Sequence, residues 1–175
     1  MKATKTYITK PILLNKTLTW KLAVFATLLG IGVIAPFLKQ QVFTGPLVNA
    51  SFFVGVALLG TEATLLLGLL PSLFALSIGL LPSVLAPMIP FIMTGNAILI
   101  LAFGYLRSKN YWLGAIVGSF LKFVFLFASS QIVINLIIKK SVATKAVMMM
   151  SWPQLLTALG GAIIAYLFLK GTKRI

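Results

Sequence analysis

The sequence predicts an all-α integral membrane protein with six transmembrane helices and with both termini in the cytoplasm. Hydrophobic residues make up 60% of the 175 residues and charged residues only 9%, and the mean hydropathy is +1.09. A soluble domain usually has about 25% charged residues, so this composition suits lipid rather than water as the surrounding solvent. No ten-residue segments of alternating hydrophobicity are present, which argues against a membrane β-barrel.

Six apolar runs are long enough to cross the hydrocarbon core of a membrane as helices, which takes about 20 residues. The second run is short, and the block from 45 to 106 has almost no charge, so its turns are placed at Thr61 and Glu62, at Pro82 and within "APMIP". The six predicted spans are 20–38, 46–60, 62–81, 84–106, 112–138 and 148–169.

Positive charges predict the orientation of these spans, because lysine and arginine are retained on the cytoplasmic side. The cytoplasmic side would hold Lys2, Lys5, Lys10, Lys16, Lys21, Arg107, Lys109, Lys170, Lys173 and Arg174, and the outer side Lys39, Lys139, Lys140 and Lys145. The chain then divides into a basic cytoplasmic tail over 1–19, a six-helix membrane domain over 20–169 and a second basic cytoplasmic tail over 170–175. The first tail is polar for too long to be a cleavable signal peptide, and we expect a multi-pass protein of the cell (plasma) membrane.

The composition also excludes several classes of activity. The chain has no cysteine and no histidine, and Glu62 is its only acidic residue. Disulfides, thiolate chemistry, histidine-ligated metals and paired-carboxylate catalysis are therefore excluded, and we expect neither an enzyme nor a cofactor nor a metal site. The net charge of +14 does not indicate nucleic acid binding, because the basic residues lie at the chain ends and in short loops between apolar runs.

One basic residue, Lys122, is the exception, because it lies inside the apolar run "GSFLKFVFLF". A charged side chain at membrane depth needs a partner or a water-filled cavity. Three interpretations are open. Lys122 reaches the inner interface or a helix C-terminal carbonyl, it neutralises an anionic group of a substrate in an internal cavity, or it pairs with Glu62, although Glu62 also suits the start of the third helix.

Other polar side chains within the runs gather toward the predicted outer half of the membrane. They include Asn49, Asn96, Gln131 and Gln154. Taken singly, an intramembrane amide more often joins two helices than contacts a ligand. Taken together, these amides predict a site that faces outward.

Small residues predict where helices approach one another closely. Ala23, Ala26 and Gly30 recur at helical spacing in the first run, and Ala158, Gly161, Ala162 and Ala165 do so in the sixth. Such surfaces allow close backbone contact between membrane helices. Either surface can pack internally or bind a partner protein.

These features together resemble the substrate-binding S component of an energy-coupling factor (ECF) transporter. The resemblance covers 20–169 and rests on the six spans, the basic tail, the small-residue first helix, a loop of the "FTGPLVNA" type, the block "GLLPSLFALSIGLLPSVLAPMIPFIMTGN", "LKF" in the fifth run and "WPQLLTALGG" at the start of the sixth. It implies a subunit that captures a vitamin or similar micronutrient from outside and associates with a transmembrane T component and two cytoplasmic ATPases. It also implies that an Ala-xxx-Ala motif on the first helix faces the T component, and Ala26 and Gly30 stand in its place here.

The resemblance and the polar residues predict the same kind of substrate site. Lys122 would supply charge complementarity and the amides would orient the ligand, while Thr44 and Gly45 in a loop would help to close the site. The expected substrate-binding residues are Thr44, Gly45, Asn49, Asn96, Lys122, Ser129, Gln131 and Gln154, and the expected partner-docking residues are Ala23, Ala26 and Gly30. Ser129 and Gln131 lie on different faces of the fifth run, so we expect at least one of them not to contribute.

Two other functions stay open from the sequence. A self-contained small carrier or channel would need the same polar interior, and a structural or assembly subunit of a membrane complex would need only the small-residue surfaces. The chain has no "GxxxxGK[ST]" motif, so ATP hydrolysis in an ECF-type transporter would belong to its partners.

Overall fold

The computed structural model of the chain describes residues 15–79, 83–137 and 147–175, and all regular structure in these ranges is helical. This confirms the predicted all-α class. Residues 1–14 of the predicted tail over 1–19, Pro82 and the three lysines of the last outer loop lie outside the described residues. In chain order the elements are α1 (Lys16–Ile34), the 3₁₀ helix η1 (Ala35–Leu38), α2 (Gln41–Leu58), α3 (Thr61–Ser77), the 3₁₀ helix η2 (Ser83–Met88), α4 (Ile89–Leu106), α5 (Tyr111–Ile137) and α7 (Trp152–Gly171).

Five helical segments of the described chain are long and apolar enough to cross a membrane, as expected for a multi-pass membrane protein. They are Lys16–Leu38, Gln41–Leu58, Ala86–Leu106, Tyr111–Val133 and Val147–Gly171. The predicted third span, 62–81, corresponds to α3, which is apolar but has only 17 residues.

The start of α2 corrects one prediction from the sequence. Thr44 and Gly45 were expected in a loop before Pro46, but they belong to the first turns of α2, where the backbone N–H groups of Phe43 and Thr44 both donate to the carbonyl of Gln40. Proline lacks a backbone N–H and its ring crowds the carbonyl four residues earlier, but a helix that is held by its neighbours can continue through it. Pro46 therefore lies inside α2 rather than at its first residue, where the predicted span 46–60 begins.

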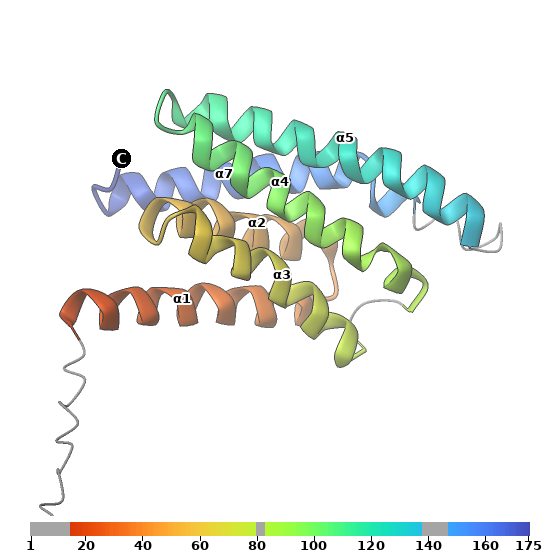
Figure 1. Cartoon of the computed structure of the whole chain (residues 1–175), viewed down its shortest axis with the longest axis horizontal. Coiled ribbons are helices and arrows are strands. Elements are labelled where there is room, and N and C mark those ends of the chain that lie inside the picture. The colour runs from red at the N-terminus through yellow and green to blue at the C-terminus, as the bar shows by residue number, and fades with distance from the viewer. Residues whose placement is uncertain (1–14, 80–82, 138–146) are drawn as a thin grey trace, which may run out of the picture.

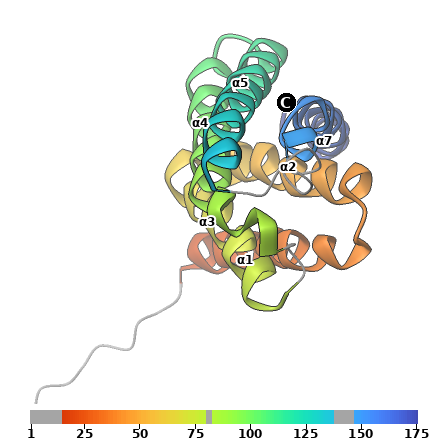
Figure 2. The ribbon, with the colours of Figure 1, turned by 90° about the vertical axis from the view of Figure 1, so that its right-hand side faces the viewer.

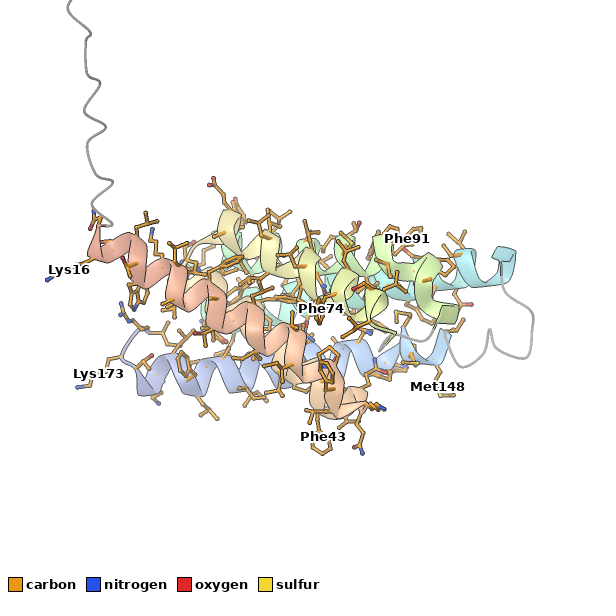
Figure 3. All side chains as sticks on the ribbon, turned by 90° about the horizontal axis from the view of Figure 1, so that it is seen from below. Lys16, Phe43, Phe74, Phe91, Met148 and Lys173 are labelled. Carbon is orange, nitrogen blue, oxygen red and sulfur yellow. The ribbon has the colours of Figure 1, made fainter. Side chains whose placement is uncertain are left out.

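The helices run back and forth along one axis, so that α2, α4 and α7 begin at the same end of the bundle (Figure 1). The C-terminus, the start of α1 and the turn from α4 to α5 lie at the other end. Figure 3 shows Lys16 and Lys173 at that end and Met148 at the opposite one. We call the end with Lys16 and Lys173 the basic end.

Helix α2 occupies the middle of the bundle and packs against α1, α3, α4 and α7 (Figure 2). Each residue from Asn49 to Val56 is buried, so the helix is covered on every side over two turns. A helix that is apolar all round is expected in such a position. The rest of the fold is arranged around this buried segment.

Small residues on α7 allow α2 to approach closely. Ala158, Gly161, Ala162 and Ala165 are all buried, and a Cβ added to Gly161 would lie 2.8 Å from the backbone oxygen of Pro46. The small-residue surface of the sixth predicted span therefore packs internally, which selects one of the two interpretations left open by the sequence.

The small-residue surface of α1 behaves differently. Ala23 and Ala26 are exposed, and no heavy atom lies within 4 Å of a Cβ built on Gly30. Within the described chain this surface is not used for internal packing. It remains open to lipid or to another protein.

Aromatic side chains fill the bundle near the basic end. The rings of Phe53 and Phe103 lie 4.8 Å apart and nearly perpendicular, and Tyr111 meets Phe103 at 5.2 Å in a similar arrangement. The hydroxyl of Tyr111 donates to the carbonyl oxygen of Ala162 at 2.7 Å, which connects α5 to α7. Edge-to-face aromatic pairs of this kind pack densely, so this half of the bundle has a filled interior.

The close contact of α2 with α7 predicts that Gly161→Ala destabilises the protein. The added methyl group meets backbone atoms that cannot move independently, so we expect a loss of roughly 1–3 kcal/mol. The thermal unfolding midpoint in detergent, followed by tryptophan fluorescence, measures it. Gly160→Ala is the matched control, because its Cβ would lie at an ordinary 3.5 Å from Pro46. Equal midpoints for the two variants would contradict the packing described for Gly161.

Candidate functional site

A cavity of about 580 Å³ lies between the helices toward the end where α2, α4 and α7 begin, away from the basic end. Its volume is in the range of small-molecule sites, which are mostly apolar with a few polar groups. The apolar part of its wall includes Pro36, Val48, Pro71, Ala75, Ile92 and Met150. The polar part holds most of the residues predicted from the sequence.

Lys122 extends from α5 into the wall of this cavity. Only 4% of the residue is exposed, and its Nζ donates a hydrogen bond of 2.7 Å to Oδ1 of Asn49 on α2. Nζ also lies 5.8 Å from the centre of the Phe52 ring. Lys122 therefore does not reach the inner interface, which rules out the first interpretation offered by the sequence.

Asn49 is held in the orientation that receives the lysine. Its Nδ2 donates to the carbonyl oxygen of Gly45, one turn earlier in α2, at 2.8 Å. Because ammonium and carbonyl groups have fixed hydrogen-bonding roles, only this orientation of the amide satisfies both neighbours. Asn49 thus turns its oxygen to Lys122 and uses its nitrogen locally.

The positive charge of Lys122 has no acidic partner within the chain. Glu62, the only acidic side chain, is exposed in the first turn of α3, at the basic end, and so the predicted pairing with Lys122 is absent. An ammonium group has three N–H donors, of which Asn49 takes one. A buried charge without a counter-charge is unfavourable, so this group is able to bind an anion that enters the cavity.

Other amides of the cavity wall use their nitrogen atoms on backbone carbonyl groups. Nδ2 of Asn96 donates to Gly68 at 2.9 Å, and Nε2 of Gln41 and of Gln154 donate to Met149 at 3.0 and 3.2 Å. A carbonyl oxygen only accepts hydrogen bonds, so each side-chain amide must point its NH₂ group toward the carbonyl. Among the described residues no hydrogen bond reaches the amide oxygens of these three residues, so these oxygens remain as acceptors beside the cavity, together with the second N–H of Gln41 and of Asn96.

The structure brings together six of the eight residues predicted to bind substrate. Those that line the cavity are Thr44, Gly45, Asn49, Asn96, Lys122 and Gln154. Ser129 and Gln131 do not line it. Ser129 lies on the same face of α5 as Lys122 but two turns, or about 10 Å, further along the helix, and Gln131 points to the opposite face.

Sequence analysis missed several polar residues of the wall. Gln41 and Thr157 are the clearest cases, together with Lys39, Gln40 and Ser72. Thr157 follows Gln154 by three residues, so helical spacing places both on one face and was a usable signal. Gln41 lies one helical turn before Gly45, so helical spacing also places these two residues on one face. This spacing was not used, because the segment was interpreted as a loop.

Comparison with known proteins gives no match of the chain to a family model, to a curated protein or to a solved structure.

The Lys122–Asn49 contact predicts unequal effects of removing its two partners. Asn49→Leu leaves a buried ammonium group without its acceptor, and we expect a loss of about 1.5–3 kcal/mol in unfolding free energy. Lys122→Met leaves only a neutral amide oxygen and removes the buried charge, so we expect a smaller loss or a gain. Thermal unfolding in detergent measures both.

The double variant with Asn49→Leu and Lys122→Met is the control for this comparison. It should be more stable than Asn49→Leu alone, since the unpaired charge is then absent. The opposite order of the two single variants would mean that Lys122 is well solvated and not held by Asn49.

Proposed function

We propose that this chain is the substrate-capture subunit of an ATP-driven micronutrient uptake transporter of the energy-coupling factor type. It binds a small molecule, a vitamin or similar micronutrient, from the outer face of the cell membrane and delivers it with the help of partner proteins. The observation that carries the proposal is the cavity at one end of the bundle, with a buried lysine that has no acidic partner. Binding of an anionic small molecule would explain a buried lysine in this wall, whereas helix packing alone would favour an apolar side chain there.

The distribution of charge supports an outward-facing cavity. The described basic residues other than Lys39 and Lys122 belong to elements that meet at the basic end, and they are Lys16, Lys21, Arg107, Lys109, Lys170, Lys173 and Arg174. Lysine and arginine favour the cytoplasmic side of a membrane. The cavity, at the opposite end, then faces outward.

Six spans with both termini inside are part of the proposal. The five longer helical segments need α3 as a sixth span if the start of α1 and the C-terminus are on the same side. A helix of 17 residues is about 25 Å long, which is at the lower limit for crossing the hydrocarbon core. Its contacts with α1, α2 and α4 favour this placement, because they cover much of its surface with protein.

The exposed surface of α1 supports a transmembrane partner. Only 17% of the residues in the apolar stretch of Lys16–Leu38 are buried inside the chain, compared with 44% for α2. Ala23, Ala26 and Gly30 leave room there for another helix to approach closely. We assign this surface to a T component, with two ATPase subunits on the cytoplasmic side.

Association with these partners is tested by purification from the native membrane. We expect the tagged chain to retain a T component and two ATPases, identified by mass spectrometry. In a variant with Ala23→Leu and Ala26→Leu, the amount of partner protein that co-purifies should fall about tenfold, because the larger side chains separate the helices. The matched control is Ala128→Leu, at an exposed alanine of α5.

Two outcomes would support the other candidate functions instead. Uptake by liposomes that contain only this chain, without ATP, would identify a self-contained carrier or channel. Association with other membrane proteins, without ATPases and without a bound small molecule, would identify a structural subunit.

A further inference from the structure

We infer that the molecule held in this cavity is a small organic acid with a single carboxylate, which binds Lys122, and with hydrogen-bond donors near its other end. The inference rests on the proposed capture function and names the class of substrate. It follows from the charge inside the cavity, from the depth at which each polar group lies and from the hydrogen bonds that these groups already make.

The charge of the wall selects an anion. Lys122 is the one buried cation of the wall in the described chain, and Glu62 is exposed at the far end of the bundle. A cationic ligand would be repelled by Lys122, and a neutral ligand would leave the ammonium group without a counter-charge. One carboxylate balances one ammonium, and its two oxygens can accept the N–H groups that Asn49 leaves free.

Within the described residues, a second negative charge at the same place has no partner. A phosphate ester carries nearly two negative charges at neutral pH, and Lys39, the other lysine of the wall, is exposed in the corner between α1 and α2. The base of the cavity therefore suits a monoanion better than a dianion.

Contacts between α2 and α7 show how far each polar group lies from the outer end of the cavity, where both helices begin. A Cβ added to Gly161 would lie 2.7 Å from Cβ of Asn49, whereas Gln41 and Gln154 meet at the carbonyl oxygen of Met149 near the start of both helices. Asn49 lies eight positions after Gln41 in α2, which corresponds to about 12 Å along the helix. The cation thus lies at the base of the cavity and the glutamines lie near its outer end.

The outer end of the cavity provides acceptors for hydrogen-bond donors of a ligand. One N–H of Gln154 donates to Met149 and Nε2 lies 4.0 Å from Sδ of Met150, so Oε1 is the atom that Gln154 leaves for a ligand. Gln41 donates one N–H to Met149 and leaves its Oε1 and its second N–H. Val48 and Ile92 line the apolar part of the wall. The matching molecule has a carboxylate at one end, an apolar body and N–H or O–H groups at its other end.

Charge-separated fractions of yeast extract, a mixture rich in micronutrients, test this inference. The purified full chain in detergent is mixed with extract that an anion exchanger has separated at about pH 7 into retained and unretained fractions. We expect only the retained fraction to raise the unfolding midpoint, by about 5 °C for a ligand well above its dissociation constant. Methyl esterification of the carboxyl groups in that fraction should abolish the shift, and phosphatase treatment should leave it unchanged.

Variants locate the effect in the cavity. Lys122→Met should lose the shift, and Lys122→Gln serves if that variant does not fold. Lys21→Met, at an exposed lysine of α1 outside the cavity, should keep it. Gln154→Leu should lower the apparent affinity about tenfold through the loss of one acceptor.

The outcomes separate this inference from the proposed function. A shift with the unretained fraction only, or one that phosphatase removes, would leave substrate capture standing and overturn the carboxylate assignment. Unchanged affinity in Gln154→Leu would overturn the placement of donors at the outer end. No shift with either fraction would overturn substrate capture, and this inference with it.

Discussion

The hydrogen bond from Lys122 to Asn49 is the interaction on which the site depends. It joins α5 to α2 between residues 73 positions apart, and it holds an ammonium group in the wall of a cavity rather than at a membrane interface. An amide satisfies one donor but does not neutralise the charge. When Lys122 is protonated, its charge is unfavourable at this buried position unless another group neutralises it, and a bound anion would do so.

The two halves of the bundle differ in a way that explains why the cavity lies at one end. Near the basic end, Phe53, Phe103 and Tyr111 fill the space between α2, α4 and α5. Toward the other end, the wall includes small side chains such as Gly45, Ala75 and Val48, and the interior is hollow. Glycine and alanine on α7 allow α2 to pack closely against it.

The sequence predicted the helical class and a helix in each of the six apolar runs, and six of the eight residues that it predicted for the site line the cavity. Long apolar runs and polar residues within them are strong signals in a membrane protein, because both are costly in the wrong solvent. The sequence did not predict that α2 continues through Pro46, which depends on contacts with α7. It predicted that at least one of Ser129 and Gln131 does not contribute, but not that both lie outside the cavity wall, and it did not predict the partner of Lys122. Both outcomes depend on how far α5 is shifted along α2 and α4. A helix that is apolar on all sides has no hydrophobic pattern from which this shift could be predicted.

The most direct test of the account asks whether position 122 is reached from outside. The chain has no cysteine, so Lys122→Cys introduces a single thiol at the base of the cavity, and Ser119→Cys introduces one at a buried position of the same helix that does not line it. In intact cells, a negatively charged, membrane-impermeant thiol reagent is predicted to label Lys122→Cys and not Ser119→Cys. Labelling of Lys122→Cys only after the cells are opened, or equal labelling of both, would contradict an outward-facing cavity with Lys122 at its base.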